Sequence, residues 1–129
     1  MSYTIDRVFD KASFDEIDER TRKALADHGF GVLTEIDVAA TMKKKLDVDM
    51  QRYRILGACN PSMAHQAIGM EPRVGAMLPC NVIIRETGSG EVTVSAIDPV
   101  ASMQAIPNEQ LKDVAGQVRK MLGDAIGAI

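Results

Sequence analysis

The residues of this chain most able to do chemistry are its two cysteines, and each is followed by an asparagine. Cys59-Asn60 precedes a proline, and Cys80-Asn81 follows one, so both pairs lie at the border of an apolar run. Apolar runs bounded by proline and asparagine are typical of strands. We expect the two strand ends to meet at one edge of a sheet, which would place both cysteines in one pocket.

Two of the three interpretations of this pocket concern the thiols alone. In the first, both cysteines are small buried residues, as free cysteine often is, and the asparagines cap a helix and hold a loop. In the second, the start of a helix after Cys59 favours its thiolate, and Cys80 is the resolving thiol. The spacing is not Cys-x-x-Cys, so no thioredoxin-type motif is present.

The third interpretation is binding. Two thiolates and one imidazole can hold Zn or Cu(I), but a structural zinc site has four ligands, so a second chain or an exogenous ligand would complete it. A small anion is the alternative, held by N–H groups at the helix start and by a lysine. The candidate catalytic or metal-binding residues are Cys59, Cys80 and, for a metal, His65; the candidate ligand-binding residues are Asn60, Asn81, His65 and Lys44.

Other catalytic motifs are absent from the sequence. It has no G-x-S-x-G, no Walker loop and no H-E-x-x-H, and Gly88-Ser89-Gly90 is a hairpin turn with no helix after it. The sequence therefore leaves open whether the protein is an enzyme, and it identifies no cofactor or substrate.

Composition narrows the class of protein. A chain of 129 residues with 46% hydrophobic and 26% charged residues is expected to form a single domain over residues 1–129. Its net charge of -3 argues against binding nucleic acid, which requires a basic face. The sequence has no secretory signal and no apolar run near the ~18 residues of a membrane span. We therefore expect no membrane association, a cytoplasmic location and reduced thiols.

The first half of the chain predicts alternating strands and helices. Residues 4–10 form a strand, and Ser13 opens a helix that ends at Gly29. Strict alternation over residues 30–38 predicts a strand with one buried face. A short helix over residues 39–46 carries Lys43, Lys44 and Lys45. Together with Arg52 and Arg54 these lysines are a candidate anion site, although a run of three lysines is more often a solvated helix face.

The second half completes the sheet. A strand over residues 53–58 leads to a helix capped by Asn60, with Ala64, Ala67 and Ile68 as its buried stripe. Residues 80–85 and 91–97 form a hairpin, residues 73–79 and 100–106 are irregular, and a last helix starts near Asn108. The order is β-α-β-β-β-β-α with two short inserted helices, which predicts an α+β fold: a curved, mainly antiparallel sheet with helices on one face. The other face of the sheet is either partly exposed to solvent or covered by a second copy of the chain, and the second arrangement would be a homodimer.

Three segments carry a family resemblance: ILGACNP at residues 55–61, LPCNVIIRE at residues 78–86 and VSAIDP at residues 94–99. With them nearly the whole chain resembles the bacterial and archaeal domain-of-unknown-function 302 family. The resemblance implies a TATA-binding-protein-like sheet domain, often homodimeric, and no activity, because the family is named for lacking one. Fold likeness is no reason to expect DNA binding.

Taken together, the sequence predicts a homodimeric binding or thiol-redox module with its site at Cys59 and Cys80. Soft-metal (Zn or Cu) or small-anion binding is one alternative. A non-catalytic structural or interaction domain with buried cysteines is the other.

Overall fold

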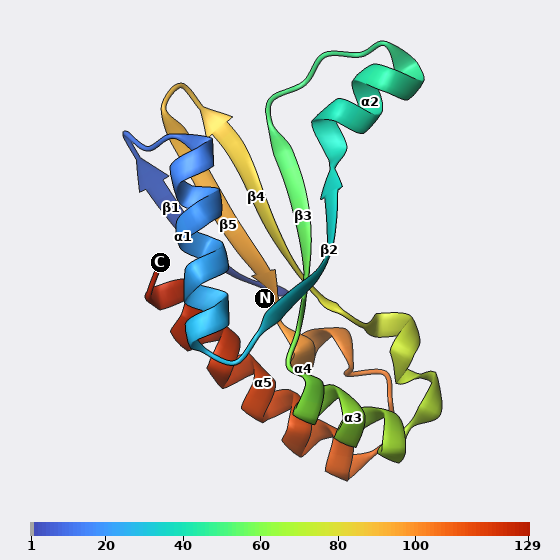
Figure 1. Ribbon diagram of the computed structural model, residues 1–129. Helices are drawn as coiled ribbons and strands as arrows, with labels where there is room; N and C mark the ends of the chain where they lie inside the picture. Colours follow the sequence, from blue (N-terminus) through green and yellow to red (C-terminus); the bar gives the residue numbers. More distant parts are fainter. Residues whose placement is uncertain (1) are drawn as a thin grey trace.

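The computed structural model describes residues 2–129. In chain order its elements are β1 (Thr4–Asp10), α1 (Phe14–Asp27), β2 (Gly31–Asp37), α2 (Val38–Leu46), β3 (Tyr53–Cys59), α3 (Pro61–Met70), the 3₁₀ helix η1 (Pro72–Met77), β4 (Cys80–Gly88), β5 (Glu91–Ile97), α4 (Pro99–Ser102) and α5 (Glu109–Gly127). The strands form one five-stranded sheet in the order β1-β5-β4-β3-β2, and each neighbouring pair is antiparallel (Figure 1). The predicted α+β class and the order of its strands and long helices are confirmed.

Helix starts are fixed by the caps that the sequence predicts. Ser13, Asn60 and Asn108 each accept a hydrogen bond from the backbone N–H three residues along, at the starts of α1, α3 and α5. Such caps satisfy N–H groups that have no partner inside the helix. After α1, Gly29 has a φ of 85°, a left-handed conformation that suits glycine. The chain therefore reverses sharply from α1 into β2.

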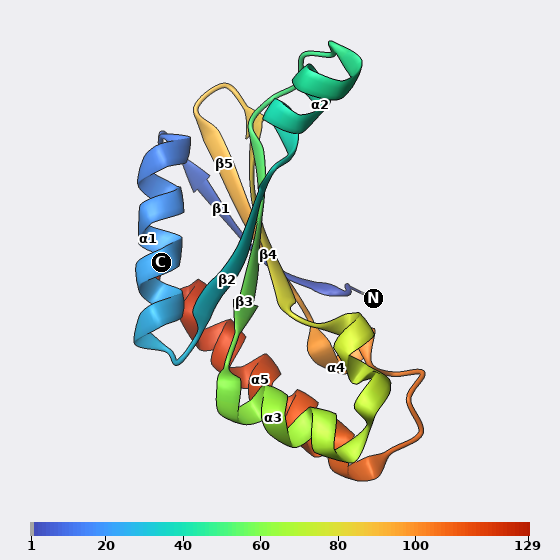
Figure 2. The ribbon, with the colours of Figure 1, turned by 45° about the vertical axis from the view of Figure 1, so that its right-hand side comes forward.

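The core lies between the sheet and the two long helices, α1 and α5, which cover the same face of the sheet (Figure 2). Helix α5 buries one apolar face, which consists of Leu111, Val114, Ala115, Val118, Leu122, Ala125 and Ile126, and the strands contribute alternate aliphatic residues. Burying such side chains is the main stabilising contribution to the fold. The largest fully buried aliphatic side chains include Ile17, Leu25, Leu56, Val82, Ile84, Val94, Leu111 and Leu122.

Strand β2 differs from its prediction, because its apolar residues do not share one buried face. The register between β2 and β3 shifts between Val32 and Thr34, which makes Leu33 an extra residue in the strand. Such a bulge moves the following side chains to the other face. Val32 therefore faces the helices, whereas Ile36 pairs with Ile55 on the open face and is 49% exposed.

Two short helices were expected to be irregular segments. Both η1 and α4 begin at a proline that follows an acidic residue, and the carboxylates of Glu71 and Asp98 accept hydrogen bonds from nearby backbone N–H groups. These helices are too short to show a helical period, so the sequence pattern missed them. No helix within residues 2–129 has the length and apolar character needed to cross a membrane.

Candidate functional site

Both cysteines line one small cavity. It lies at the end of the sheet where β3 leads into α3, a junction that can be followed in Figure 1. Cys59 ends β3 and Cys80 begins β4, and the residue before Cys59, Ala58, pairs in register with Cys80. The cavity has a volume of about 30 Å³. Its walls come from β3, α3, the segment before β4, α4 and α5, and include Phe30, Ala58, Asn60, Ala64, Ala67, Leu78, Pro79, Pro99, Val114, Ala115 and Val118.

The two thiols have different environments. Cys80 is 7% exposed, and burial, followed by the nearness of Cys59, raises the pKa of its thiol to about 11. Cys80 is therefore a neutral thiol near neutral pH, and a neutral thiol is a weak nucleophile. Cys59 is only partly buried, so solvent reaches it. Both cysteines are free, without a disulfide.

Asn60 positions the cavity wall with both ends of its side-chain amide. Its Oδ1 accepts from the Met63 N–H at 3.0 Å, which caps α3. Its Nδ2 donates to the Gly29 carbonyl at 3.1 Å, which joins α3 to the turn between α1 and β2. Because both amide atoms are engaged in the fold, Asn60 lines the cavity as a positioning residue.

Three other predicted residues do not line the cavity. Asn81 is exposed and pairs with Gly57, one strand position away from Cys80, so it faces the other side of the sheet. His65 is exposed on α3. Within residues 2–129, no three His, Cys, Asp or Glu side chains are placed to hold a metal ion together, so the expected set of Cys59, Cys80 and His65 is not assembled.

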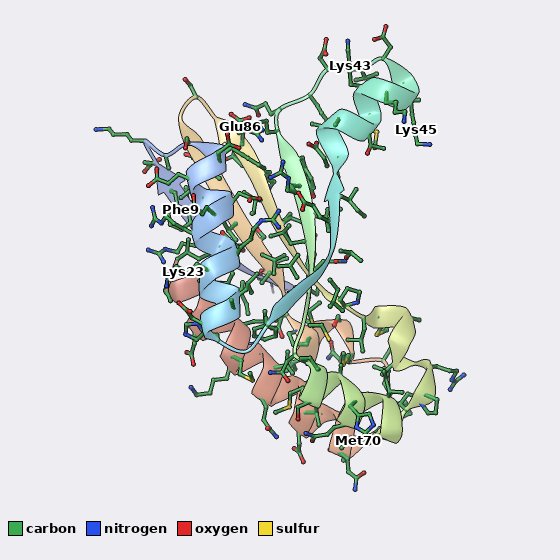
Figure 3. All side chains as sticks on the ribbon, in the orientation of Figure 1. Phe9, Lys23, Lys43, Lys45, Met70 and Glu86 are labelled. Atoms are coloured by element: carbon green, nitrogen blue, oxygen red, sulfur yellow. The ribbon has the colours of Figure 1, made fainter. Side chains whose placement is uncertain are left out.

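Lys44 lies on α2, which is at the opposite end of the molecule from α3. Figure 3 shows its neighbours Lys43 and Lys45 on α2, and Met70 at the far end of α3. Lys44 is exposed and forms no ion pair within residues 2–129, whereas Lys43 contacts two aspartates of the loop after α2. Lys44 therefore cannot contribute to a ligand in the cysteine-lined cavity.

The two arginines of the expected basic cluster are paired with carboxylates. Arg54, whose side chain is 16% exposed, pairs with Asp18 at 2.9 Å, with Glu35 at 3.3 Å and with Asp37 at 3.7 Å. Arg52 pairs with an aspartate of α1 and stacks on an aromatic ring. These arginines join α1 to β2 and β3, and they leave no cationic pocket for an anion.

Two methionines complete the cavity wall and were not recognised from the sequence. Met63 belongs to the inner stripe of α3 with Ala64 and Ala67, whereas Ile68, predicted to be buried there, is 46% exposed. Met103 follows α4, an element that the sequence did not predict. The sequence did offer a signal for Met63, because it lies one turn after Cys59 on a helix whose cap, Asn60, was correctly predicted. Nothing in the sequence identified Met103.

The chemistry of the cavity is apolar with sulfur donors. Among residues 2–129 no charged side chain lines it, and the side-chain amide of Asn60 is engaged in the fold. The start of α3 offers few donors to an anion, because Pro61 has no N–H and the Met63 N–H is already bonded to Asn60. The arrangement therefore suits a neutral or soft ligand and does not suit a small anion.

The fold and this cavity define a class of α+β domain with an open antiparallel sheet, two long helices on one face and a pair of thiols at one end of the sheet. The chain belongs to the family described as domain of unknown function DUF302, whose model matches residues 5–129. A similar solved structure is that of an uncharacterized conserved protein DUF302 from Bacillus stearothermophilus. It shares 23% sequence identity with a TM-score of 0.90 over 99% of this chain and 98% of that chain, which shows the fold. No curated protein matches the chain.

Proposed function

We propose that the chain is a single-domain, cytoplasmic, homodimeric binding module, and that the cavity lined by Cys59 and Cys80 is its site. The observation that carries this proposal is that both cysteines, from two neighbouring strands, line one cavity while Cys59 stays partly exposed. A ligand can therefore approach one thiol and reach the second. Two free thiols fit a reducing compartment.

Binding is favoured over thiol-redox exchange by the state of Cys80. A resolving thiol must ionise to attack a disulfide, and burial holds the pKa of Cys80 near 11. Only about one Cys80 thiol in 10⁴ is ionised at pH 7 with such a pKa. Exchange through Cys80 would therefore be slow, whereas binding requires no turnover.

Binding is also favoured over a purely structural role for the two cysteines. Well-packed cores leave few voids larger than a water molecule. A cavity of about 30 Å³ is large enough for a water or a single ion, yet its wall offers a water few polar partners. This space is retained at a wall that both cysteines share, and that coincidence supports a site.

Alkylation of the native protein tests the site. Reduced, chelator-treated protein is treated with iodoacetamide, unfolded, and treated again with an isotopically heavy reagent, and each cysteine is read by peptide mass spectrometry. We expect Cys59 to carry the first label and Cys80 the second. Protein labelled in denaturant is the control, because both thiols must then react. If both cysteines stay unlabelled until unfolding, they are core residues and the proposed site is abandoned.

We propose that the second copy of the chain packs against the open face of the sheet and against α2. An apolar row crosses three strands of that face, because Ile36 pairs with Ile55 and Ile55 pairs with Ile83. Helix α2 has no buried residue and projects beyond the sheet in both views (Figures 1 and 2). The loop after α2 adds further apolar side chains, since Leu46, Val48 and Met50 are 66%, 49% and 43% exposed.

A second copy fits this surface better than a strongly charged partner. The surface combines apolar residues with lysines on α2 and aspartates on the following loop, so it carries both signs of charge. A twofold interface places the same patch against itself and requires such self-complementarity. It would also cover β2, an edge strand whose backbone groups are free to pair.

A further inference from the structure

The sulfur-containing residues that line the cavity come from four separate parts of the chain. Cys59 ends β3, Met63 lies on the first turn of α3, Cys80 begins β4, and Met103 follows α4. The other side chains of the wall are hydrocarbon, apart from Asn60, whose amide atoms are engaged in the fold. The side-chain donors left for a ligand are therefore two thiols and two thioethers.

Resting on the binding function proposed above, we propose that this cavity is a Cu(I) site, with Cys59 as its thiolate ligand, Met63 and Met103 as thioether ligands, and the buried side chain of Cys80 as part of its wall. Thiolate and thioether sulfur are soft ligands, and Cu(I) is one of the soft metal ions that they bind. The proposal uses residues of the cavity wall only, and it excludes His65 and Lys44, which lie elsewhere.

Charge and coordination favour Cu(I) over Zn(II) in this cavity. A structural zinc site takes four ligands from Cys, His, Asp and Glu, and the described residues place fewer than three of these together here. Methionine thioether is not among these zinc ligands. One thiolate and neutral sulfur donors around Cu(I) give a complex with no net charge, which a wall without charged side chains can hold.

Size and access fit a single ion. The volume of about 30 Å³ exceeds the roughly 10–15 Å³ that one small occupant requires, and it is too small for a typical organic ligand. Cys59 is partly exposed and is the first ligand that an incoming ion meets. Binding replaces the Cys59 proton, which passes to solvent, and neither the metal nor the protein is oxidised or reduced.

A competition titration tests the proposal. Reduced full-length protein is titrated without oxygen with Cu(I), supplied as its acetonitrile complex, against the chromogenic chelator bicinchoninate. We expect one Cu(I) per chain, and Zn(II) should not compete for it. Cys59→Ser should weaken binding by more than about 100-fold, and Met63→Leu by about 10-fold. Met70→Leu is the matched control on the same helix, and its affinity should equal that of the unchanged protein.

Methionine methyl resonances give a second readout that does not depend on a variant. The chain has eight methionines, so a ¹³C-methyl-labelled sample reports on each of them. Addition of one equivalent of Cu(I) should shift the methyl signals of Met63 and Met103 and leave that of Met70 in place. Unfolding transitions of the three variants, recorded alongside, identify any loss of affinity that is caused by a loss of fold.

The outcomes separate the metal from the site. Absence of Cu(I) binding, or binding that moves neither the Met63 nor the Met103 methyl signal, overturns the Cu(I) assignment. If Cys59 is still alkylated in the native protein, the proposed binding site stands without this metal. If Cys59 is silent in the native protein as well, the proposed function fails together with the Cu(I) site.

Discussion

Cys80 shows how the position of a single residue sets its chemistry. The sequence predicted that the two cysteines meet, because each lies at the end of an apolar run that forms a strand. It could not predict that Cys80 faces the helices and Cys59 stays partly exposed, since that depends on which side chains surround each sulfur. The difference between the two thiols is therefore a property of packing, and it decides which of them a reagent reaches.

The pKa of Cys80 predicts a loss of stability in alkali. The folded state keeps this thiol protonated up to about pH 11, whereas an unperturbed thiol ionises near 9.0. The resulting stabilisation is complete below pH 9.0 and is lost as the pH rises toward about 11, by roughly 1.4 kcal/mol per pH unit. The free energy of unfolding of metal-free protein, measured in urea from pH 8 to 10, should therefore fall toward that of Cys80→Ala. A gap between the two proteins that stays constant with pH would contradict this.

Asp18 predicts the opposite dependence in acid. Burial alone would raise its pKa, but hydrogen bonds from Arg22 at 2.7 Å and Arg54 at 2.9 Å, with their positive charges, outweigh burial and lower it. Its contribution is present above pH 3.8 and is lost as the pH falls through the lower, folded-state pKa. Asp18→Asn should cost about 1–3 kcal/mol at pH 7, because it leaves two guanidinium groups with fewer partners.

Urea unfolding of Asp18→Asn at pH 7 and pH 3 measures this cost, and the difference from the unchanged protein should shrink at pH 3. Asp27→Asn is the control, because Asp27 forms an exposed pair with Lys23 on the same helix. Exposed pairs contribute little, so this variant should remain close to the unchanged protein at both pH values. If Asp18→Asn lowers the free energy of unfolding no more than Asp27→Asn does, the ion pairs that link α1 to β3 are not stabilising.

At the scale of elements, local signals predicted the helix starts and the strands, and tertiary contacts decided the rest. The caps at Ser13, Asn60 and Asn108 depend on a few neighbouring residues, so the sequence shows them. The bulge at Leu33 does not, because it depends on how β2 pairs with β3. For the same reason Met103 was missed, since it reaches the cavity through α4, a helix too short for a periodic pattern.

Gly57 of β3 lies where β2 and the segment before β4 approach closely. A Cβ at this position would collide with Thr34 Oγ1 and would lie 2.6 Å from Pro79 Cγ. Gly57→Ala must therefore displace β2 or the segment that holds Pro79, and it should cost roughly 1–3 kcal/mol in the free energy of unfolding. Because Pro79 also lines the cavity, native alkylation of Cys59 should change in rate as well.

The matched control is Gly116→Ala on the helix α5, because a Cβ built there meets no atom within 4 Å apart from its chain neighbours and its own helix backbone. Alanine is the better helix former, so this variant should gain about 0.5–1 kcal/mol. Urea unfolding of both variants measures the two effects. If Gly57→Ala is as stable as the unchanged protein, the close approach of β2 and Pro79 to β3 is not rigid.

At the scale of the whole molecule, the sequence predicted the sheet and the face that the helices cover, since hydrophobic period and element order define both. It also predicted that the other sheet face is either wet or shared with a second copy. The sequence could not locate the proposed surface between copies, because the apolar row of Ile36, Ile55 and Ile83 on the open face forms only when three strands align. The projecting helix α2 is visible only in three dimensions.

The proposed dimer predicts different effects at the two edges of the sheet. Ile36→Asp places a charge in the proposed interface on β2 and should convert the dimer to a monomer in sedimentation velocity. Val8→Asp is the control, since Val8 is an exposed apolar residue on β1, the opposite edge strand, and its exposure of 55% is close to the 49% of Ile36. Val8→Asp should remain a dimer. An unchanged protein that is monomeric, or an Ile36→Asp variant that stays dimeric, would contradict the proposed interface.

The most direct test of the cysteine-lined cavity as a binding site is to fill it and measure the alkylation rate of Cys59. Ala64 lies on the cavity wall, so Ala64→Leu introduces a larger side chain into that space without a strong change in helix propensity. Ala26→Leu, on the exposed face of α1, is the control. Reaction of iodoacetamide with Cys59 should slow severalfold in Ala64→Leu and stay unchanged in Ala26→Leu. Equal rates in all three proteins would mean that reagents reach Cys59 from the outer surface, and that the cavity is not its binding site.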